Sequence, residues 1–559
     1  MRQKKTLVLA MFLIVSLMLA ACTQSNNNTE ASGSGEASGT SETVGSSSQP
    51  IDENVTWDSP NLSWKKDTTP TSMTAYMDYT WWPMDSWGND EVSQEITKRT
   101  GMTLDITKAS DENQLQVMIA SNELPCLVYT ANPAFEKYFE DPKVSFAYDE
   151  LIEKYAPEFM QLLDPEQVFL NTSEDGHFYR IRSHYTSEAE FNDPKNVPGP
   201  GMATLHFRQD IYNELGNPPM KTLDDIINVF KMVKEKYPDM IPYLPNWIPF
   251  MEYMGFQSTP KSIGDKVTIG LAEPGAVAYY EYMNELYRNG LIPKEYMSYK
   301  YEQFLEVVRS GKVFAASYNA SFSDEQNKFF DTNNIKGKWT PLNTPPTVNG
   351  EMKMKRIVPS GGWSNLYITK SCPDPARAIK YFEFLKSPEG DSLAQWGIEG
   401  VHYTLTEDGL LKRPESFQQK TIQQAGVGPN YGLWNFGASG YREGIVNASI
   451  ANSDPKYATS VTFLKAMKPY ISQDMFINFT NPKSGSDEGV IQTKINQIIL
   501  RYEPKMITAK TKEQVDEVYN EMLEDMKKTG LPKLEEYMTA EYNKAKQKYS
   551  EFVQKTTNS

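Results

Sequence analysis

Cysteine and histidine are scarce in this 559-residue chain, and their scarcity excludes several kinds of site. The three cysteines are too few for a disulfide scaffold or a four-cysteine zinc site. None of the four histidines has the His-Glu-x-x-His spacing of zinc proteases. The chain also lacks a Gly-x-Ser-x-Gly motif and a phosphate-binding loop ending in Gly-Lys-Ser/Thr. The sequence therefore does not indicate an enzyme, and we expect no cofactor.

Positive charge is also in short supply. Acidic residues outnumber Lys and Arg by 72 to 56, which gives a formal net charge of −16. A nucleic acid requires clustered basic side chains against its phosphates, so we expect no nucleic-acid partner.

Aromatic residues, in contrast, make up 12% of the chain. This is the composition of a globular protein that is rich in large flat side chains.

The N-terminus has the features of an export signal. Arg2, Lys4 and Lys5 precede an apolar run over residues 7–21, which ends in two alanines before Cys22. A cysteine after small residues resembles a bacterial lipobox, in which the thiol carries a diacylglycerol. We expect a signal peptide over residues 1–21 and lipid attachment at Cys22, on the extracytoplasmic face of the cell membrane. An ordinary signal peptide with a chance cysteine, or an uncleaved helix, is the alternative.

A flexible linker is expected over residues 22–70. Residues 23–50 are almost entirely Ser, Asn, Gly, Thr, Glu and Ala, which bury too little apolar surface to offset the entropy of ordering. About 500 residues remain beyond this segment, enough for two or more hydrophobic cores. No second apolar stretch in the sequence is long enough to cross a membrane.

The first part of the globular body alternates strand and helix. Helices are expected to begin at Asn89 or Asp90, with Gly101 ending the first, and at Asp111. Strands are expected over residues 73–79, 102–107 and 124–129. A β-α-β-α-β order implies parallel strands joined by right-handed crossovers. Cys126 lies in the third apolar strand and is expected to be a buried thiol, although one disulfide with Cys372 is possible.

Longer helices are expected in the rest of the chain. The segment 222–225 resembles a capping box, and the helix that it opens should end at Pro238. A strand is expected over residues 311–318, and Asp374 with its following proline should begin another helix. The last sixty residues read as charged, amphipathic helices on the outside of a lobe.

Several segments, taken in order, resemble one protein family. They are residues 149–157, 174–179, 205–210, 215–225, 311–316 and 396–404, of which the last, Trp-Gly-Ile-Glu-Gly-Val-His-Tyr-Thr, is the most specific. The chain resembles the extracellular solute-binding protein family 1 of ABC transporters, in its large Gram-positive lipoprotein branch. The resemblance implies an α/β, two-lobed periplasmic-binding-protein-like fold (type II) with a hinge and a central ligand cleft.

The same resemblance implies the partners and the lobes. The ligand would be a sugar or oligosaccharide, delivered to ABC permease subunits that a separate ATPase powers, and we expect a monomer. The N-terminal lobe is expected over residues 71–195 and 359–425, and the C-terminal lobe over residues 196–358 and 426–559. These boundaries are approximate, because the chain crosses between the lobes several times.

One segment departs from the relatives that bind alginate-type oligosaccharides. Those relatives carry a calcium loop, rich in Asp and Asn, after the helix that the capping box opens. In this chain the same place, residues 236–242, retains an Ile-Pro pair but only Asp239 among the acidic residues. Because calcium requires six to eight oxygen ligands, we expect no metal there.

Ligand contacts are expected from aromatic residues in loops. A sugar stacks its C–H faces on Trp and Tyr rings, and open α/β sheets bind ligands beyond the carboxyl ends of their strands. The predicted ligand-binding residues are Trp81, Trp82, Trp87, Trp247, Trp363, Tyr431, Trp434 and Arg208. Packing within a lobe is the alternative for each tryptophan and for Tyr431, and an ion pair with Asp210 is the alternative for Arg208.

The sequence therefore predicts a lipid-anchored extracytoplasmic solute-binding protein for sugars. A membrane-tethered carbohydrate-degrading enzyme is an alternative, because glycoside hydrolysis needs only two well-placed carboxylates. A binding lipoprotein for peptides or other small solutes is another. Should the ligand be an acidic glycan, Arg180, Arg182 and Arg208 are the first candidates for a basic patch.

Overall fold

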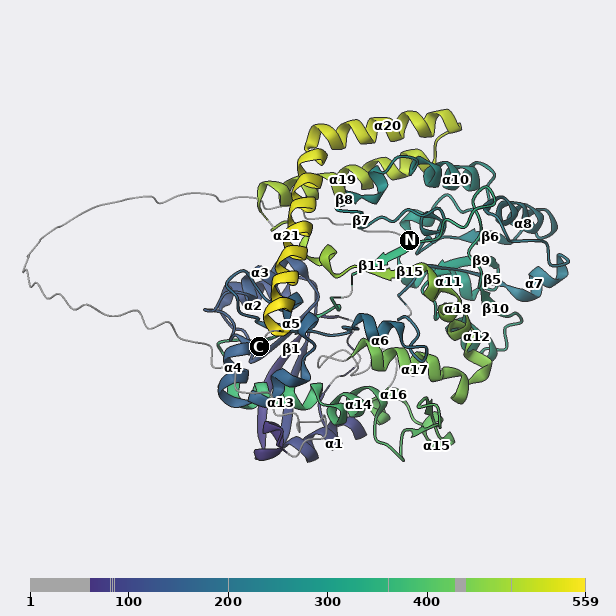
Figure 1. Cartoon of the computed structure of the whole chain (residues 1–559). Coiled ribbons are helices and arrows are strands. Elements are labelled where there is room, and N and C mark those ends of the chain that lie inside the picture. The colour runs from purple at the N-terminus through teal and green to yellow at the C-terminus, as the bar shows by residue number, and fades with distance from the viewer. Residues whose placement is uncertain are drawn as a thin grey trace, which may run out of the picture. The chain divides into compact units, whose positions relative to one another are not determined.

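The computed structural model (Figure 1) describes residues 61–80, 82, 84, 86–199, 201–359, 361–427, 439–483 and 485–557. All described residues belong to one compact unit of the chain. Cys22, Trp81, Tyr431 and Trp434 lie outside the described residues. Within them, no helix combines the length and the apolar character needed to span a bilayer.

The first sheet has five strands in the order β2-β1-β3-β12-β4. They are β1 (Thr71–Met77), β2 (Met102–Lys108), β3 (Leu127–Thr130), β4 (Arg180–Arg182) and β12 (Asn365–Ile368). β1 pairs in parallel with β2 and β3, whereas β12 is antiparallel to both β3 and β4. The predicted parallel β-α-β-α-β unit is confirmed, and β1, β3 and β4 all end at the edge where β12 begins.

A side-chain cap and a glycine fix the two ends of the first helix on this sheet. Asp90 accepts a hydrogen bond from Ser93 N at 2.8 Å and caps α1 (Glu91–Thr100). Gly101 ends α1 with φ of 71°, and a side chain there would collide with the backbone of Thr68. Further helices of this part are α2 (Gln114–Ser121), α3 (Glu136–Phe139), α4 (Tyr148–Tyr155), α5 (Pro165–Asn171), α13 (Pro375–Lys386) and α14 (Pro388–Trp396).

The second sheet has four strands in the order β10-β5-β9-β6. They are β5 (Thr204–Arg208), β6 (Ile241–Leu244), β9 (Val313–Tyr318) and β10 (Trp339–Pro341). β6 is parallel to β9, and β5 is antiparallel to β9 and β10. The predicted strand over residues 311–318 is confirmed as β9, and its first five residues are buried.

The predicted capping box is also confirmed. Thr222 and Asp225 exchange side-chain and backbone hydrogen bonds at 3.0 Å, at the start of α8 (Leu223–Lys236). The other helices of the second part are α7 (Gln209–Glu214), α9 (Phe250–Tyr253), α10 (Val277–Arg288), α11 (Tyr301–Arg309) and α12 (Phe322–Thr332). A hairpin of β7 (Pro260–Ile263) and β8 (Lys266–Ile269) completes this part.

The chain crosses between the two sheets three times. It passes from β4 to β5 through α6 (Glu188–Asn192), returns from β10 to β12, and crosses again through α17 (Gly440–Ser453) and α18 (Thr459–Met467). α17 packs against α14, and α18 packs against α12. Two crossing segments pair with each other, because β11 (Arg356–Val358) is parallel to β15 (Ile471–Gln473). Short elements before α17 are β13 (Thr404–Leu405), β14 (Leu411–Lys412), α15 (Glu415–Gln418) and α16 (Ile422–Ala425).

The predicted C-terminal helices are confirmed as α20 (Lys512–Thr529) and α21 (Leu531–Thr557), and α19 (Asp487–Ile507) precedes them. α19 and α20 pack against α10 (Figure 1). α21 contacts the β7–β8 hairpin, where Thr539 Oγ1 accepts a hydrogen bond from Val267 N at 3.0 Å. Further along α21, the Tyr549 ring lies 4.9 Å from the Phe169 ring of α5. This helix therefore contacts both the part of the chain around the first sheet and the part around the second.

The structure corrects the expectation of a buried free thiol at Cys126. Cys126 and Cys372 form a disulfide bond. The physical reason is the pairing of β3 with β12. Leu127 faces Ile368, Thr369 N donates to Cys126 O at 2.9 Å, and a turn in which Cys372 N donates to Thr369 O at 3.0 Å brings Cys372 to Cys126. A separation of 246 residues in the sequence hides this neighbourhood from pattern reasoning.

Glu383 of α13 is a buried carboxyl that binds the backbone of η1 (Ser63–Lys66). Its Oε2 accepts a hydrogen bond from Trp64 N at 2.7 Å, and its Oε1 has no hydrogen-bond partner among the described residues. Burial raises the pKa of Glu383 from 4.5 to about 7, because the charged form loses its hydration. The folded chain therefore favours the protonated form, and its stability falls as the pH rises from 4.5 to about 7.

Replacing Glu383 with Gln should stabilise the protein at pH 8. E383Q keeps an oxygen that accepts from Trp64 N and removes the charge, so the gain should be up to about 3 kcal/mol at pH 8 and should vanish towards pH 5. Urea unfolding at both pH values measures it, with E153Q on the exposed side of α4 as the control. An equal gain at both pH values would contradict the assignment.

Candidate ligand-binding site

Aromatic residues gather where the strands of the first sheet end. Tyr79 follows β1 and Trp363 precedes β12, and their rings stack with centroids 5.3 Å apart and planes at 27°. Trp363 is 43% exposed, whereas Tyr79 is buried. Trp82 also stacks on Tyr79, at 6.4 Å, and Tyr129 of β3 lies 5.7 Å from Tyr79 in an edge-on contact. We call Tyr79, Trp82, Tyr129 and Trp363 the first aromatic cluster.

Hydrogen bonds fix the position of Trp363. Its backbone N donates to Ser183 O at 2.7 Å, and the neighbouring Ser364 is hydrogen bonded to the Tyr79 hydroxyl. Gly362 has φ of 86°, and a Cβ there would lie 2.4 Å from Ser183 O. Only glycine permits this turn, which brings the exposed indole onto Tyr79.

A second set of rings lies where β6 and β9 end, at one edge of the second sheet. Trp247 follows β6, Tyr318 ends β9 and Tyr301 begins α11. The Trp247 and Tyr318 rings are 4.8 Å apart, and Tyr301 stacks on Tyr318 at 5.0 Å and 25°. Trp247 is 43% exposed, and Tyr301 is exposed as well. We call Trp247, Tyr301 and Tyr318 the second aromatic cluster.

Buried hydroxyls support the second cluster from below. Ser317 Oγ accepts a hydrogen bond from Asn246 N at 3.2 Å and is hydrogen bonded to the Tyr243 hydroxyl at 2.8 Å. These bonds hold the loop after β6 against β9. They therefore position the indole of Trp247 beside Tyr318.

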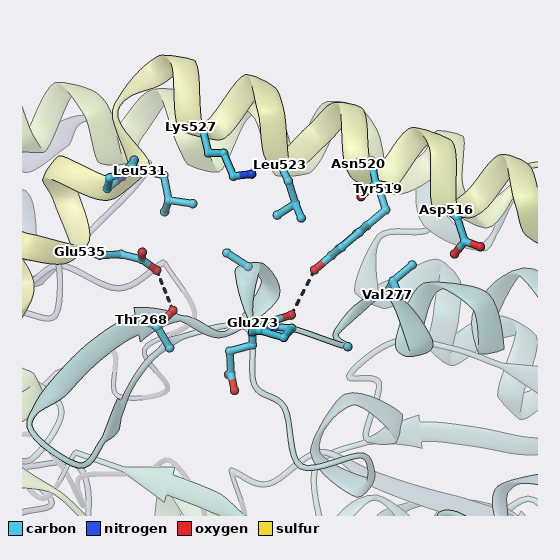
Figure 2. Close-up of a pocket in the computed structure, with 14 residues that line it drawn as sticks. Thr268, Glu273, Val277, Asp516, Tyr519, Asn520, Leu523, Lys527, Leu531 and Glu535 are labelled. Carbon is cyan, nitrogen blue, oxygen red and sulfur yellow. Dashed lines mark hydrogen bonds between the residues drawn. The ribbon is translucent and has the colours of Figure 1, made fainter.

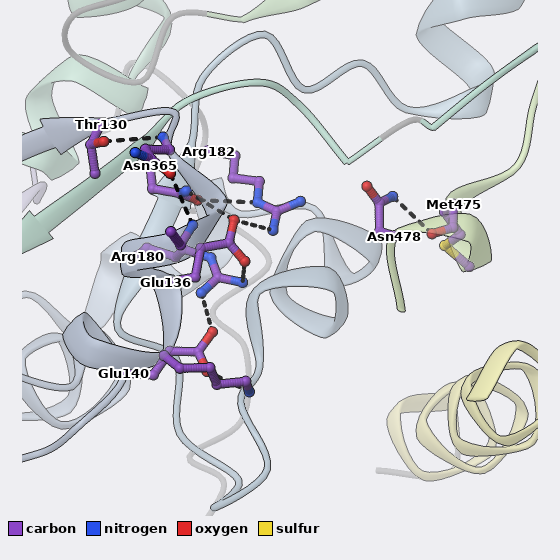
Figure 3. Close-up of polar contacts among 11 residues, drawn as sticks. Thr130, Glu136, Glu140, Arg180, Arg182, Asn365, Met475 and Asn478 are labelled. Atoms are coloured by element: carbon purple, nitrogen blue, oxygen red, sulfur yellow. Dashed lines mark hydrogen bonds and ion pairs between the residues drawn. The ribbon is translucent and has the colours of Figure 1, made fainter. Parts of the chain in front are cut away.

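Planar polar side chains surround the first cluster's edge (Figure 3). Arg182 ends β4, and its Nε donates to Asn365 Oδ1 at 3.1 Å while its Nη2 lies 3.2 Å from Glu136 Oε1. Asn365 Nδ2 also donates to Glu136 Oε1, at 3.2 Å. Arg180 forms ion pairs with Glu136 and Glu140. We call Glu136, Glu140, Arg180, Arg182 and Asn365 the charged network.

Nearby positive charge keeps Glu140 of this network ionised. Burial alone would raise the pKa of Glu140, but Arg180 and Lys137 hold it below its usual value. Burial and the nearby charge of Arg180 lower the pKa of Arg182. The network therefore balances two guanidinium groups against two carboxylates.

Two further acidic groups lie beside the aromatic clusters. Asp78 Oδ2 accepts a hydrogen bond from Thr130 Oγ1 at 2.7 Å, and burial raises the pKa of Asp78. Desolvation raises the pKa of Tyr301 and of Tyr318, and the negative charge of Glu325 raises both further. Asp78 thus adjoins the first cluster, and Glu325 lies in the first turn of α12, whose Phe322 ring is 6.2 Å from the Tyr318 ring.

The structure separates the predicted tryptophans into different environments. Trp363 and Trp247 are exposed at strand ends, whereas Trp82 is only 1% exposed and lies beneath Tyr79. Trp87 is half-buried, and its Nε1 donates to Thr97 Oγ1 of α1 at 2.8 Å. The predictions for Trp81, Tyr431 and Trp434 fall outside the described residues and stay predictions.

The expectation of a ligand contact at Arg208 needs correction. Arg208 is buried and donates from Nε and Nη2 to the two carboxylate oxygens of Asp210, at 2.9 and 2.7 Å. It also donates to the backbone oxygens of Gly311 and Lys336. Because β5 is antiparallel to β9, its end lies at the sheet edge opposite Tyr318. The alternative, an ion pair with Asp210, is what the structure shows.

Sequence reasoning missed the tyrosines of both clusters. Tyr79 and Tyr318 are the final residues of the strands predicted over 73–79 and 311–318, so their place at the carboxyl ends was a usable signal. Tyr301 begins α11, the helix that directly precedes β9, but no sequence pattern marks its ring as a neighbour of Tyr318. Among the described residues, no group of three or more His, Cys, Asp or Glu is placed to hold a metal.

A cavity of about 760 Å³ lies elsewhere, between the α20–α21 elbow and the segment after β8 (Figure 2). Its fourteen lining residues include one aromatic side chain, Tyr519, which is buried and donates to Leu271 O at 2.8 Å. Glu535 on its wall accepts a hydrogen bond from Thr268 Oγ1 at 2.6 Å. This lining offers no exposed ring face on which a sugar could stack.

Comparison with known proteins identifies the fold. No family model matches the chain. The polygalacturonan/rhamnogalacturonan-binding protein YtcQ of Bacillus subtilis (strain 168) is 24% identical over 350 residues, which cover 58% of this chain and 66% of that relative, just under two thirds of its length. Relatives are thus detectable by sequence, at low identity.

Three solved structures match most of the chain. The S. pneumoniae ABC-transporter substrate binding protein FusA in complex with kestose has a TM-score of 0.63 and 17% identity, over 86% of this chain and 100% of that one. The alginate-binding protein AlgQ2 without calcium ion has a TM-score of 0.61 and 18% identity, over 85% of this chain and 99% of that one. An extracellular solute-binding protein from Bifidobacterium longum subsp. infantis has a TM-score of 0.60 and 14% identity, over 85% of this chain and 98% of that one. The predicted fold is confirmed: the chain has the two-lobed α/β fold of the ABC-transporter solute-binding proteins.

Proposed function

We propose that this chain is an extracytoplasmic solute-binding protein that captures a sugar or oligosaccharide and delivers it to an ABC importer. The observation that carries the proposal is the pair of exposed indoles, Trp363 and Trp247, each at the carboxyl end of strands in its own sheet. Open α/β sheets bind ligands at this end, and exposed aromatic faces bind the C–H faces of sugar rings. The names of the similar proteins, which include binders of oligosaccharides, support the same class of ligand.

In this proposal the ligand lies in a cleft between the two aromatic clusters. Trp363 and Trp247 stack on its rings, and planar groups such as Asn365 hydrogen bond to its hydroxyls. Asn478 of η8 (Met475–Phe479) is a further candidate, because it lies directly against Gly361, two residues before Trp363. Tyr79 and Tyr318 hold the two indoles in place.

We propose binding without hydrolysis. A glycosidase needs one protonated carboxyl as acid and a second carboxylate as base or nucleophile. Glu136 and Glu140, at the edge of the first cluster, are ion-paired with arginines, and Arg180 and Lys137 hold the pKa of Glu140 below its usual value. Groups held in this way serve poorly as general acids.

Mutation of the two exposed indoles should reduce affinity without reducing stability. Trp363→Ala and Trp247→Ala should each weaken binding of an oligosaccharide found by thermal-shift screening by about tenfold to a hundredfold, because each removes one stacking face. Titration calorimetry measures the affinity, and the melting temperature should change little for such exposed side chains.

The matched control is Tyr155→Ala, which removes a half-buried ring from α4, away from the strand ends. It should lower the melting temperature and leave the affinity unaltered. Unaltered affinity in both tryptophan variants would contradict the proposed site. A screen in which no oligosaccharide binds would contradict the proposed function.

Ligand binding should compact the protein. A ligand that touches both clusters favours a closed arrangement of the two lobes, and only such a difference in affinity can shift their population. The paired strands β11 and β15 lie in the segments that connect the sheets and are the proposed hinge. Small-angle X-ray scattering should show a smaller radius of gyration at saturating oligosaccharide, and an unchanged profile would contradict closure.

We further propose that Cys22 carries the lipid that anchors the protein, and that separate permease and ATPase chains complete the importer. The basic start, the apolar run and the small residues before Cys22 support the anchor. In bacteria given labelled palmitate, the protein should carry the label in the membrane fraction, and Cys22→Ser should abolish both the labelling and the membrane retention. Labelling that persists in C22S would contradict attachment at Cys22.

A further inference from the structure

The arginines at the edge of the first aromatic cluster are not available to an anionic ligand. Arg182 binds Glu136 and Asn365, and Arg180 binds Glu136 and Glu140, within one hydrogen-bonded network (Figure 3). The side chains of Arg180 and Arg182 are only 7% and 11% exposed. A carboxylate of a ligand would have to displace Glu136 from a nearly buried ion pair, and that would leave a buried charge without its partner.

A carboxyl group lies beside the first cluster. Asp78 follows β1 directly before Tyr79, and hydroxyl groups rather than cations are its hydrogen-bond partners. The imidazole of His184, whose ring lies 6.3 Å from the Trp363 ring, is paired with Glu443, at 2.7 Å between Nδ1 and Oε2. A negative ligand would therefore meet like charge at the first cluster.

Two further arginines are also bound to carboxylates, and the segments outside the described ranges add no Lys or Arg beyond residue 21. The internal residues outside the described ranges (81, 83, 85, 200, 360, 428–438 and 484) include no Lys or Arg, and neither do residues 22–60. Arg208 lies at the opposite edge of the second sheet and is bound to Asp210. Arg356, in the crossing strand β11, is paired with Glu252 at 2.7 Å.

We infer that this site takes an uncharged oligosaccharide, held by ring stacking and by hydrogen bonds to its hydroxyls, and that it discriminates against oligosaccharides that carry uronic acids. The inference rests on the proposed function and names the ligand class of the same site. The paired arginines and glutamates act as fixed planar donors and acceptors for hydroxyl groups, because their charges cancel within the network.

The test compares matched pairs of ligands on the chain from Cys22 to Ser559. Each pair consists of an oligouronate (galacturonate, glucuronate or mannuronate) and the same oligosaccharide with its carboxyl groups reduced to neutral alcohols. In every pair that binds, calorimetry should show the neutral member at least about tenfold tighter. Its affinity should be nearly the same at low and high salt, because no ion pair with the ligand contributes.

A variant tests the physical cause of this preference. Glu136→Gln removes one carboxylate from the charged network and leaves Arg182 without its acidic partner. The ratio of uronate affinity to neutral affinity should therefore rise by about tenfold. Glu95→Gln is the matched control, because it makes the same charge change beside Arg99 on α1 and should leave the ratio unaltered.

The outcomes separate the inference from the proposed function. Equal or tighter binding of the uronate members in the wild-type chain would overturn the inference and leave a sugar-binding protein. An unaltered ratio in E136Q would overturn the charged network as the cause. If no member of any pair binds, the inference fails together with the proposed function.

Discussion

The stacking of Trp363 on Tyr79 is the contact on which the rest of the site depends. It joins two segments that are nearly 300 residues apart in the sequence, and it forms because β12 enters the first sheet antiparallel to β3 and starts where β1 ends. The left-handed backbone of Gly362 and the hydrogen bond from Trp363 N to Ser183 O fix the indole in this place. One face of a tryptophan is thus presented by a rigid sheet edge rather than by a free loop.

The second sheet also presents an exposed indole beside a tyrosine at the carboxyl ends of its strands. Trp247 and Tyr318 follow neighbouring parallel strands, and buried hydroxyls tie the Trp247 loop to β9. Since the two sheets are joined by paired crossing strands, a ligand that contacts both indoles would couple its own binding to the arrangement of the lobes. Rigid edges on a movable pair of lobes suit capture and release of an intact ligand better than they suit chemical conversion.

Local patterns in the sequence were sufficient for the framework of the fold. Capping at Asp90 and Thr222, the breaks at Gly101 and Pro238, and the strands that became β1, β2, β3 and β9 were all predicted from nearby residues. The antiparallel entry of β12 was not predictable in this way, because strand pairing between distant segments is decided by tertiary packing. That single feature explains both the Cys126–Cys372 disulfide, which the sequence left open, and the contact of Trp363 with Tyr79.

For the site, the sequence predicted that tryptophans would be exposed at strand ends, but it did not show which of the predicted residues lie there. Trp247 and Trp363 are exposed at strand ends, whereas Trp82 is buried and Arg208 lies at the wrong edge because β5 is antiparallel to β9. A crystal structure of the chain with an uncharged oligosaccharide bound would show directly where the ligand lies. We expect sugar rings stacked on both Trp363 and Trp247. A ligand bound in the cavity beneath α20, with both indoles still exposed, would contradict this expectation.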